Sequence, residues 1–285
     1  MILERYINPY TDFGFKKLFV LRNFSRLYAM LTMVVATVSC WGQATERPFP
    51  YPAIPDVLRE PALRMEYLME RYWSMFDFND TTAVNRQTEE QGFVDFINML
   101  QYCDSTLAAR SVKALMDSVS HDATRLKRFE DLTDHYLGNP NSPMRNDVSY
   151  AHLLRALPET PQRTFLIGQV TKNLPGTIAA DFTIADENGV TRRMHDTRSV
   201  RTLLVFFDPQ CEHCVQMMPQ IKASVARVPA EALQVFYVNI AENDQLERGY
   251  YFPALPSLYL LDSDKRVEIK DGSLEQIMKV LLSHE

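Results

Sequence analysis

Two cysteines, Cys211 and Cys214, have only two residues between them in the stretch DPQCEHC. Such a pair can belong to a zinc site, to a structural disulfide, or to a dithiol that exchanges electrons with other proteins. Structural zinc needs about four nitrogen or sulfur ligands, and the sequence contains no second C-x-x-C and no H-x-x-x-H. A disulfide that closes so short a loop stabilises a fold only weakly. The exchanging dithiol is the favoured interpretation, and the other two remain open.

The position of the pair also favours exchange. Residues 202–208, TLLVFFD, form a continuous apolar run of the kind expected for a buried central strand. A helical pattern follows the cysteines, so Cys211 is predicted to lie at a helix N-terminus. The helix dipole and the free N–H groups there favour a thiolate, which is the form that attacks disulfides. Cys214, one turn later, can then attack the mixed disulfide and release the product.

The elements that must hold this pair belong to a predicted α/β domain over residues 171–285. Residues 181–194 have strand patterns on both sides of Asn188-Gly189, which predicts a hairpin. Further strands are predicted at 202–208, at 233–240 and as a pair within 257–270. The helix after the cysteines contains Pro219, and a closing helix is predicted with Ser273 as its N-cap.

The preceding residues, 45–170, are predicted to form an all-α domain. A proline-rich leader is followed, over 61–168, by apolar residues at helical spacing in five or six segments. Ser105 is a candidate N-cap, and Gly138 is a candidate residue just beyond a helix end. Arg145 is expected to form a salt bridge at a helix start. Residues expected in the core are Tyr72, Trp73, Phe76, Phe78 and Cys103.

Residues 172–285 resemble the thioredoxin-like superfamily, closest in style to secreted TlpA/peroxiredoxin-like domains. The resemblance rests on GTIAADFTIADENG (176–189), LLVFFDPQCEHC (203–214) and ALPSLYLLD (254–262). It implies a thioredoxin fold, in which a central mixed sheet is flanked by helices. It also implies that Cys211 attacks, Cys214 resolves, His213 tunes the pair, and Pro256 is a cis-proline that faces Cys211 and positions the substrate backbone. It implies no dissociable cofactor. It does imply two kinds of partner, client proteins with thiols or disulfides and a redox partner that recycles the dithiol.

The chain departs from the thioredoxin pattern around the motif. The buried Asp that thioredoxin carries six residues before its first active-site cysteine is Val205 here, and the usual Trp is Gln210. Both departures leave open an alternative, a secreted binding or scaffold protein with little redox activity. His213 stabilises the reduced form of the pair, whereas Glu212 disfavours a neighbouring thiolate. We expect a reduction potential of roughly −250 to −150 mV.

Residues 48–170 resemble an uncharacterised helical domain found before thioredoxin-like domains in secreted proteins of Bacteroidota. The segments YLMERYWSMFDFNDT (67–81) and HYLGNPNSPMRND (135–147) carry this resemblance. It implies no particular activity.

Residues 22–44 have the pattern of a secretory signal peptide. A basic flank precedes an apolar run over 27–38 that is too short to span a bilayer, and a small-x-small cleavage pattern follows at 42–44. A buried N-terminal helix is the alternative. If Ser39-Cys40 ends a lipobox, Cys40 is lipidated and anchors the protein to a membrane. We predict export to the periplasm or to the outer surface of the cell envelope.

Residues 5–19, RYINPYTDFGFKKLF, resemble the opening of transposase-associated PD-(D/E)XK nucleases. No catalytic arrangement of that family follows, so no nuclease residue is assigned. We expect residues 1–21 to be a gene-fusion scar or the product of a start site placed too early. The net charge of −6 argues against a nucleic-acid partner.

Overall fold

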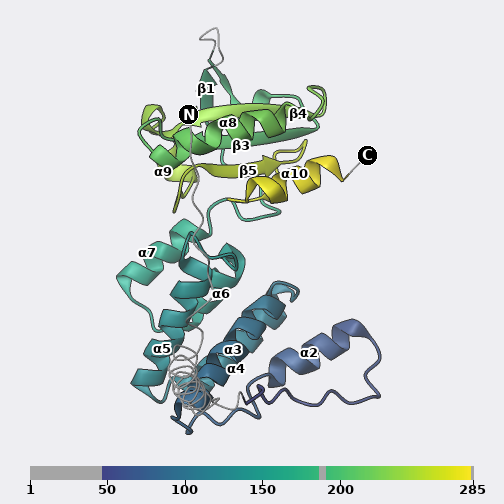
Figure 1. Cartoon of the computed structure of the whole chain (residues 1–285), viewed down its shortest axis with the longest axis vertical. Coiled ribbons are helices and arrows are strands. Elements are labelled where there is room, and N and C mark those ends of the chain that lie inside the picture. Colours follow the sequence, from purple (N-terminus) through teal and green to yellow (C-terminus); the bar gives the residue numbers. More distant parts are fainter. Residues whose placement is uncertain (1–46, 186–190, 284–285) are drawn as a thin grey trace, which may run out of the picture. The chain divides into compact units, whose positions relative to one another are not determined.

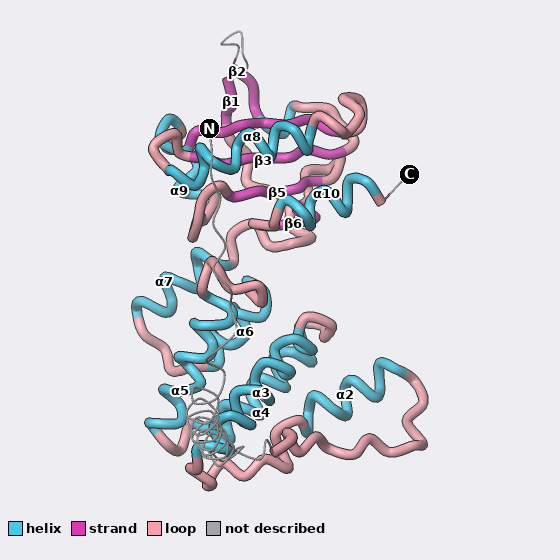
Figure 2. Tube along the Cα trace, viewed as in Figure 1, coloured by secondary structure: helices cyan, strands magenta, loops and turns pink. Residues whose placement is uncertain are grey.

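The computed structural model describes residues 47–185 and 191–283 (Figures 1 and 2). Contacts divide the chain into a small unit, Met1–Pro48 with Thr82–Thr88, and a large unit, Phe49–Thr81 with Glu89–Glu285. The large unit contains both the helical region and the sheet region considered below. The predicted signal peptide, Cys40 and the nuclease-like segment lie outside the described residues. No helix within the described ranges is long and apolar enough to cross a membrane.

The helical region confirms the predicted all-α pattern. Its α-helices are α2 (Pro61–Arg71), α3 (Ala83–Leu100), α4 (Ser105–Val119), α5 (Ala123–Thr133), α6 (Asp147–Ala156) and α7 (Pro161–Val170). A π-helical turn, η1 (Asp134–Gly138), continues α5, so Gly138 is the last helical residue and Asn139 is the cap, one residue later than the sequence predicts. A Cβ at Gly138 would lie 2.6 Å from the Tyr150 hydroxyl, so a larger residue there would require the tyrosine side chain to move.

The predicted N-cap of α4 was wrong by one residue. Ser105 is the first residue of the helix, and Asp104 is the cap. The Asp104 carboxylate accepts the backbone N–H groups of Thr106 and Leu107 at 2.8 Å each. An aspartate placed one residue earlier satisfies two free N–H groups of the first turn, which the serine at position 105 does not reach.

The core of the helical region is aromatic. Tyr72, Trp73 and Phe76 are buried, and Phe78 packs against them, as predicted. Their rings meet at centroid distances such as 5.4 Å for Tyr72 and Trp73, within the range for favourable aromatic pairs. Cys103 packs half-buried at the edge of this core, and burial raises the pKa of its thiol. The cluster therefore holds the helices together.

The sheet region contains a four-stranded mixed sheet in the order β4-β3-β5-β6 (Figure 1). The strands are β3 (Arg201–Phe207), β4 (Leu233–Asn239), β5 (Ser257–Leu261) and β6 (Val267–Ile269). β4 is parallel to β3, whereas β5 and β6 are antiparallel to their neighbours. The predicted hairpin is present as β1 (Thr183–Ala185) paired with β2 (Thr191–Arg193), and its turn lies outside the described residues.

Helices cover the sheet, and β3 is buried on both of its faces. Leu203 and Val205 pack with α8 (Glu212–Val225) and α10 (Leu274–Leu282), which lie on one face (Figure 1). Leu204 and Phe206 point to the other face, where α9 (Leu246–Gly249) contributes Leu246. A central strand covered on both faces needs an uninterrupted apolar sequence. This is the thioredoxin fold that the sequence predicts.

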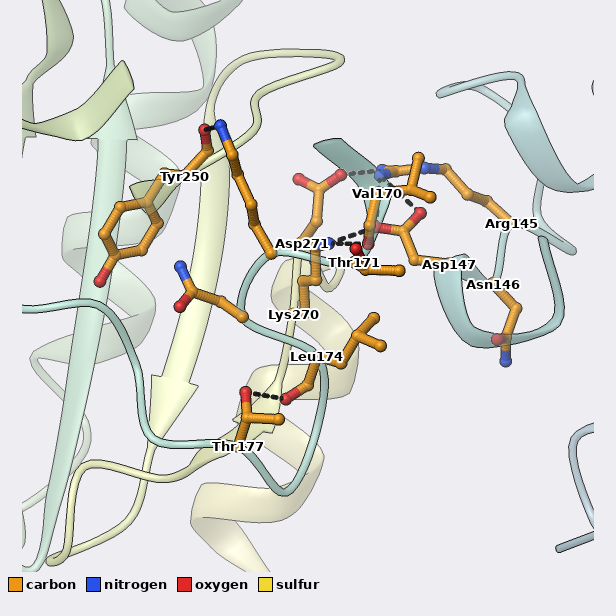
Figure 3. Close-up of polar contacts among 12 residues, drawn as sticks. Arg145, Asn146, Asp147, Val170, Thr171, Leu174, Thr177, Tyr250, Lys270 and Asp271 are labelled. Carbon is orange, nitrogen blue, oxygen red and sulfur yellow. Dashed lines mark hydrogen bonds and ion pairs between the residues drawn. The ribbon is translucent and has the colours of Figure 1, made fainter. Parts of the chain in front are cut away.

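A buried group of charged side chains connects α6 with the segment after β6 (Figure 3). Lys270 Nζ lies 2.6 Å from an Asp147 carboxylate oxygen and donates to the Val170 carbonyl at 2.7 Å. Arg145 forms the predicted salt bridge at the start of α6, with Asp147 at 3.1 Å, and also pairs with Asp271. The four side chains are between 3% and 12% exposed. Burial lowers the pKa of Lys270, and Asp147 opposes that shift.

Candidate active site

Cys211 is the N-cap of α8, and its sulfur takes the place of a capping oxygen. Its backbone is extended, with φ −78° and ψ 111°, and the helix begins at Glu212. The backbone N–H of Cys214 donates to Cys211 Sγ at 3.2 Å. An N-terminal N–H aimed at the sulfur, together with the positive end of the helix dipole, stabilises negative charge there. The geometry therefore suits a nucleophilic thiolate at Cys211.

Cys214 lies one turn along α8 in a different environment. Its side chain is 1% exposed, whereas Cys211 is half-buried, and both are free thiols. Burial, followed by the hydrogen bond with Cys211, raises the pKa of the Cys214 thiol to about 11, while the Asp208 backbone acts in the opposite direction. Cys214 is therefore a neutral thiol at pH 7, and the accessible sulfur of the pair is that of Cys211.

Pro256 lies on the segment that faces Cys211. The Leu255–Pro256 peptide bond is cis, and β5 begins at the next residue. The Leu255 carbonyl oxygen is 3.9 Å from Cys211 Sγ and accepts its S–H. The chain just before β5 therefore contacts the Cys211 sulfur directly, and the structure brings Cys211, Cys214 and Pro256 together.

The remaining residues of the motif lie at its exposed rim. His213 and Glu212 are exposed, and the Glu212 carboxylate accepts the Gln216 side-chain amide at 3.2 Å. Gln210 is exposed, and its backbone N–H donates to Asp208 Oδ1 at 2.8 Å. Among the described residues, no three His, Cys, Asp or Glu side chains are grouped so that they could hold a metal ion.

Val205, which occupies the position of thioredoxin's buried Asp, lies in an apolar layer of the structure. Val205 is 0% exposed and packs in the layer between β3 and α8. Position 205 therefore offers no carboxylate as a proton acceptor.

A cleft of about 740 Å³ is lined by His213 and Pro256, and neither cysteine is part of its lining. The sequence did not predict it, because its walls come from segments that are far apart in the chain. The sheet region contributes His213, Leu255, Pro256 and residues 270–273 with side chains of α10. The helical region contributes residues 140–143 and 145–148. The only local signal for the cleft in the sequence was the turn pattern NPNSPMRND. This pattern predicts a loop, but it does not predict which distant residues the loop contacts.

Comparison with known families places this site in context. The family model "Thioredoxin" matches residues 190–283, and the model "Domain of unknown function (DUF5106)" matches residues 27–166. Both matches begin after residue 26, so neither supports the resemblance of residues 5–19 to a nuclease. No curated protein matches the chain.

Among solved structures, a thioredoxin-like protein from Bacteroides caccae is 25% identical, with a TM-score of 0.70. The alignment covers 84% of this chain and 99% of that one, so the likeness extends across the helical and the sheet regions. The C-terminal domain of an uncharacterised protein from Bacteroides fragilis is 26% identical over 39% of this chain and 99% of that one, with a TM-score of 0.34. A domain of a possible thiol-disulfide isomerase from Cytophaga hutchinsonii is 24% identical over 40% of this chain and 95% of that one, with a TM-score of 0.36. The C-terminal part of the chain is thus similar to the thioredoxin family model, and the part before it is similar to the DUF5106 model.

Proposed function

We propose that the protein is a thiol–disulfide oxidoreductase that acts on protein disulfides through Cys211 and Cys214. One observation carries the proposal. The half-buried sulfur of Cys211 caps α8 and accepts the Cys214 N–H at 3.2 Å, while Cys214 is buried behind it. This arrangement gives one accessible nucleophilic sulfur and one buried sulfur that can resolve the mixed disulfide.

The chemistry proceeds in two displacements. The Cys211 thiolate attacks one sulfur of a client disulfide, a new S–S bond joins the client to Cys211, and the other client sulfur leaves and takes up a proton. Cys214 then loses its proton and attacks Cys211 Sγ, which releases the second client thiol. The client disulfide gains two electrons, and the Cys211–Cys214 pair becomes a disulfide. The same steps in reverse oxidise a client dithiol.

Either direction requires a partner that restores the starting form. A second dithiol/disulfide protein is the class of partner that can exchange two electrons with the pair. We further propose that the protein acts after export, supported by the signal-peptide pattern of residues 22–44 and the lipobox-like Cys40. The compartments outside the cytoplasm are those in which protein disulfides persist.

A binding or scaffold function is the second candidate, and Val205 favours it. Thioredoxin's proton acceptor for the second cysteine is replaced by a fully buried valine, which would slow the second displacement. Under this alternative, the fold serves as a frame and the cysteine pair exchanges few electrons.

A redox titration distinguishes the two functions. The purified protein is equilibrated in glutathione or dithiothreitol buffers, and its free thiols are counted by alkylation and intact mass. We expect one two-electron transition between roughly −250 and −150 mV, unchanged in Cys103→Ser. A pair that stays oxidised down to below about −300 mV would behave as a structural disulfide and would favour the scaffold.

A further inference from the structure

We propose that the loop between η1 and α6, residues 139–146, forms one wall of the groove that holds the client during exchange. The occupant is an extended polypeptide segment that flanks the reacting client cysteine. The N-terminal helical region would then select clients for the thioredoxin domain. This inference rests on the proposed function of the cysteine pair.

The cleft shares lining residues with the candidate active site. His213 and Pro256 line it, and the Leu255 carbonyl, also in its lining, contacts Cys211 Sγ. Its volume of about 740 Å³ falls within the range of roughly 300–1,000 Å³ typical of binding pockets. Cys211 is not part of the lining, but Leu255 joins the two, so a chain bonded to Cys211 Sγ would have the cleft close by.

The wall from the helical region is held in place by its own bonds. The Asn139 N–H donates to the Asp134 carbonyl at 2.9 Å, and the Ser142 hydroxyl donates to the Tyr136 carbonyl at 2.6 Å. Arg145 pairs with Asp271 on the opposite wall, with both side chains at most 12% exposed (Figure 3). A groove fixed in this way loses little conformational entropy when a client binds.

The lining of the cleft favours a polypeptide with uncharged side chains. Its buried charges, on Arg145, Asp147, Lys270 and Asp271, are paired with one another. The exposed charges in the lining, Glu275 and Lys279, are of opposite sign. The rest of the wall offers prolines, small side chains and polar amides or hydroxyls, namely Pro140, Asn141, Ser142, Pro143, Asn146, Pro175 and Ala254. Apolar rings beside neutral hydrogen-bonding groups suit an extended backbone better than an anionic small thiol.

Val148 offers a test that leaves the redox pair unchanged. It lines the cleft from the second residue of α6 and is 39% exposed. Val148→Glu places an uncompensated negative charge in the groove, and a carboxylate in the first turn of a helix is compatible with folding. Val57→Glu is the matched control, because Val57 is 85% exposed and is not part of the lining.

Two probes with the same leaving group separate client binding from chemistry. One is an uncharged ten-residue peptide with a central cysteine activated as its 2-thiopyridyl disulfide, and the other is the 2-thiopyridyl disulfide of 2-mercaptoethanol. Release of the thiopyridone reports attack by Cys211. We expect Val148→Glu to lower the second-order rate constant for the peptide by about tenfold and to leave the small probe unchanged. Val57→Glu should change neither.

The outcomes keep the two proposals apart. If Val148→Glu slows both probes equally, slows neither, or acts no differently from Val57→Glu, the groove assignment is overturned while the redox function stands. The assignment is also overturned if the wild-type protein prefers the small probe. If the wild-type protein reacts with neither probe, the proposed function fails and the groove assignment fails with it.

Discussion

Replacing Cys214 with Ser should leave the first displacement within about threefold of its wild-type rate and should stop the second. The variant then accumulates as a mixed disulfide between Cys211 and its client. The reason is that Cys211 is the accessible sulfur at the start of α8, whereas Cys214 is buried, so we expect it to react only with Cys211. An intramolecular thiol acts at an effective concentration of about 10⁵ M or more, which millimolar external thiol cannot replace. Release of the client should slow by about a thousandfold or more.

Reduced variants are mixed with a polypeptide disulfide, quenched in acid and analysed by intact mass. Cys211→Ser is the complementary variant and should form no adduct, because a serine hydroxyl cannot form a disulfide. Cys103→Ser should behave as wild type, because Cys103 packs at the edge of the helical core. Adducts that form equally in Cys211→Ser would show that Cys211 is not the attacking sulfur. Wild-type turnover in Cys214→Ser would show that Cys214 is not the resolving sulfur.

Replacing Asp147 with Asn should lower the free energy of unfolding by about 3–5 kcal/mol. Asp147 is 8% exposed and pairs with both Arg145 and Lys270. Without its charge, Arg145 keeps Asp271 as a partner, whereas Lys270, which is 3% exposed, keeps just the Val170 carbonyl. A buried ammonium without a carboxylate is costly, because water no longer solvates it and no partner replaces the water.

Urea unfolding followed by circular dichroism measures this loss. Asp117→Asn is the matched control, because Asp117 forms an exposed pair with Lys113 on α4. That variant should lose less than about 1 kcal/mol. Combining Asp147→Asn with Lys270→Met removes the orphaned charge as well and should recover part of the stability. Equal losses in Asp147→Asn and Asp117→Asn would mean that the buried charge group does not stabilise the fold.

Local sequence patterns were sufficient for the elements that carry the redox pair. The apolar run of 202–208 predicted β3 because a strand covered on both faces has no polar alternation to obscure it. The closing helix begins at the predicted cap, Ser273, which forms a capping box with Gln276. These features depend on neighbours within a few residues, so the sequence contains them directly.

Features that depend on distant residues could not be predicted in the same way. Arg145 was expected at a helix start, and its Asp147 partner is two residues away. Its other partner, Asp271, is 126 residues away, and no local pattern connects the two. The cleft was missed for the same reason, since its lining comes from segments as far apart in the chain as residues 140–143, His213 and residues 270–273. The short helix α9 was also missed, because four residues give no helical period.

The most direct test of the central claim is to map disulfides during a single turnover of the wild-type protein. Reduced protein is mixed with a polypeptide that holds one disulfide, quenched in acid at intervals, and digested for mass spectrometry. We predict a transient bond between the client and Cys211 that decays as a Cys211–Cys214 disulfide and two client thiols appear. A client reduced without any bond to Cys211, or a pair that remains a dithiol throughout, would contradict the account.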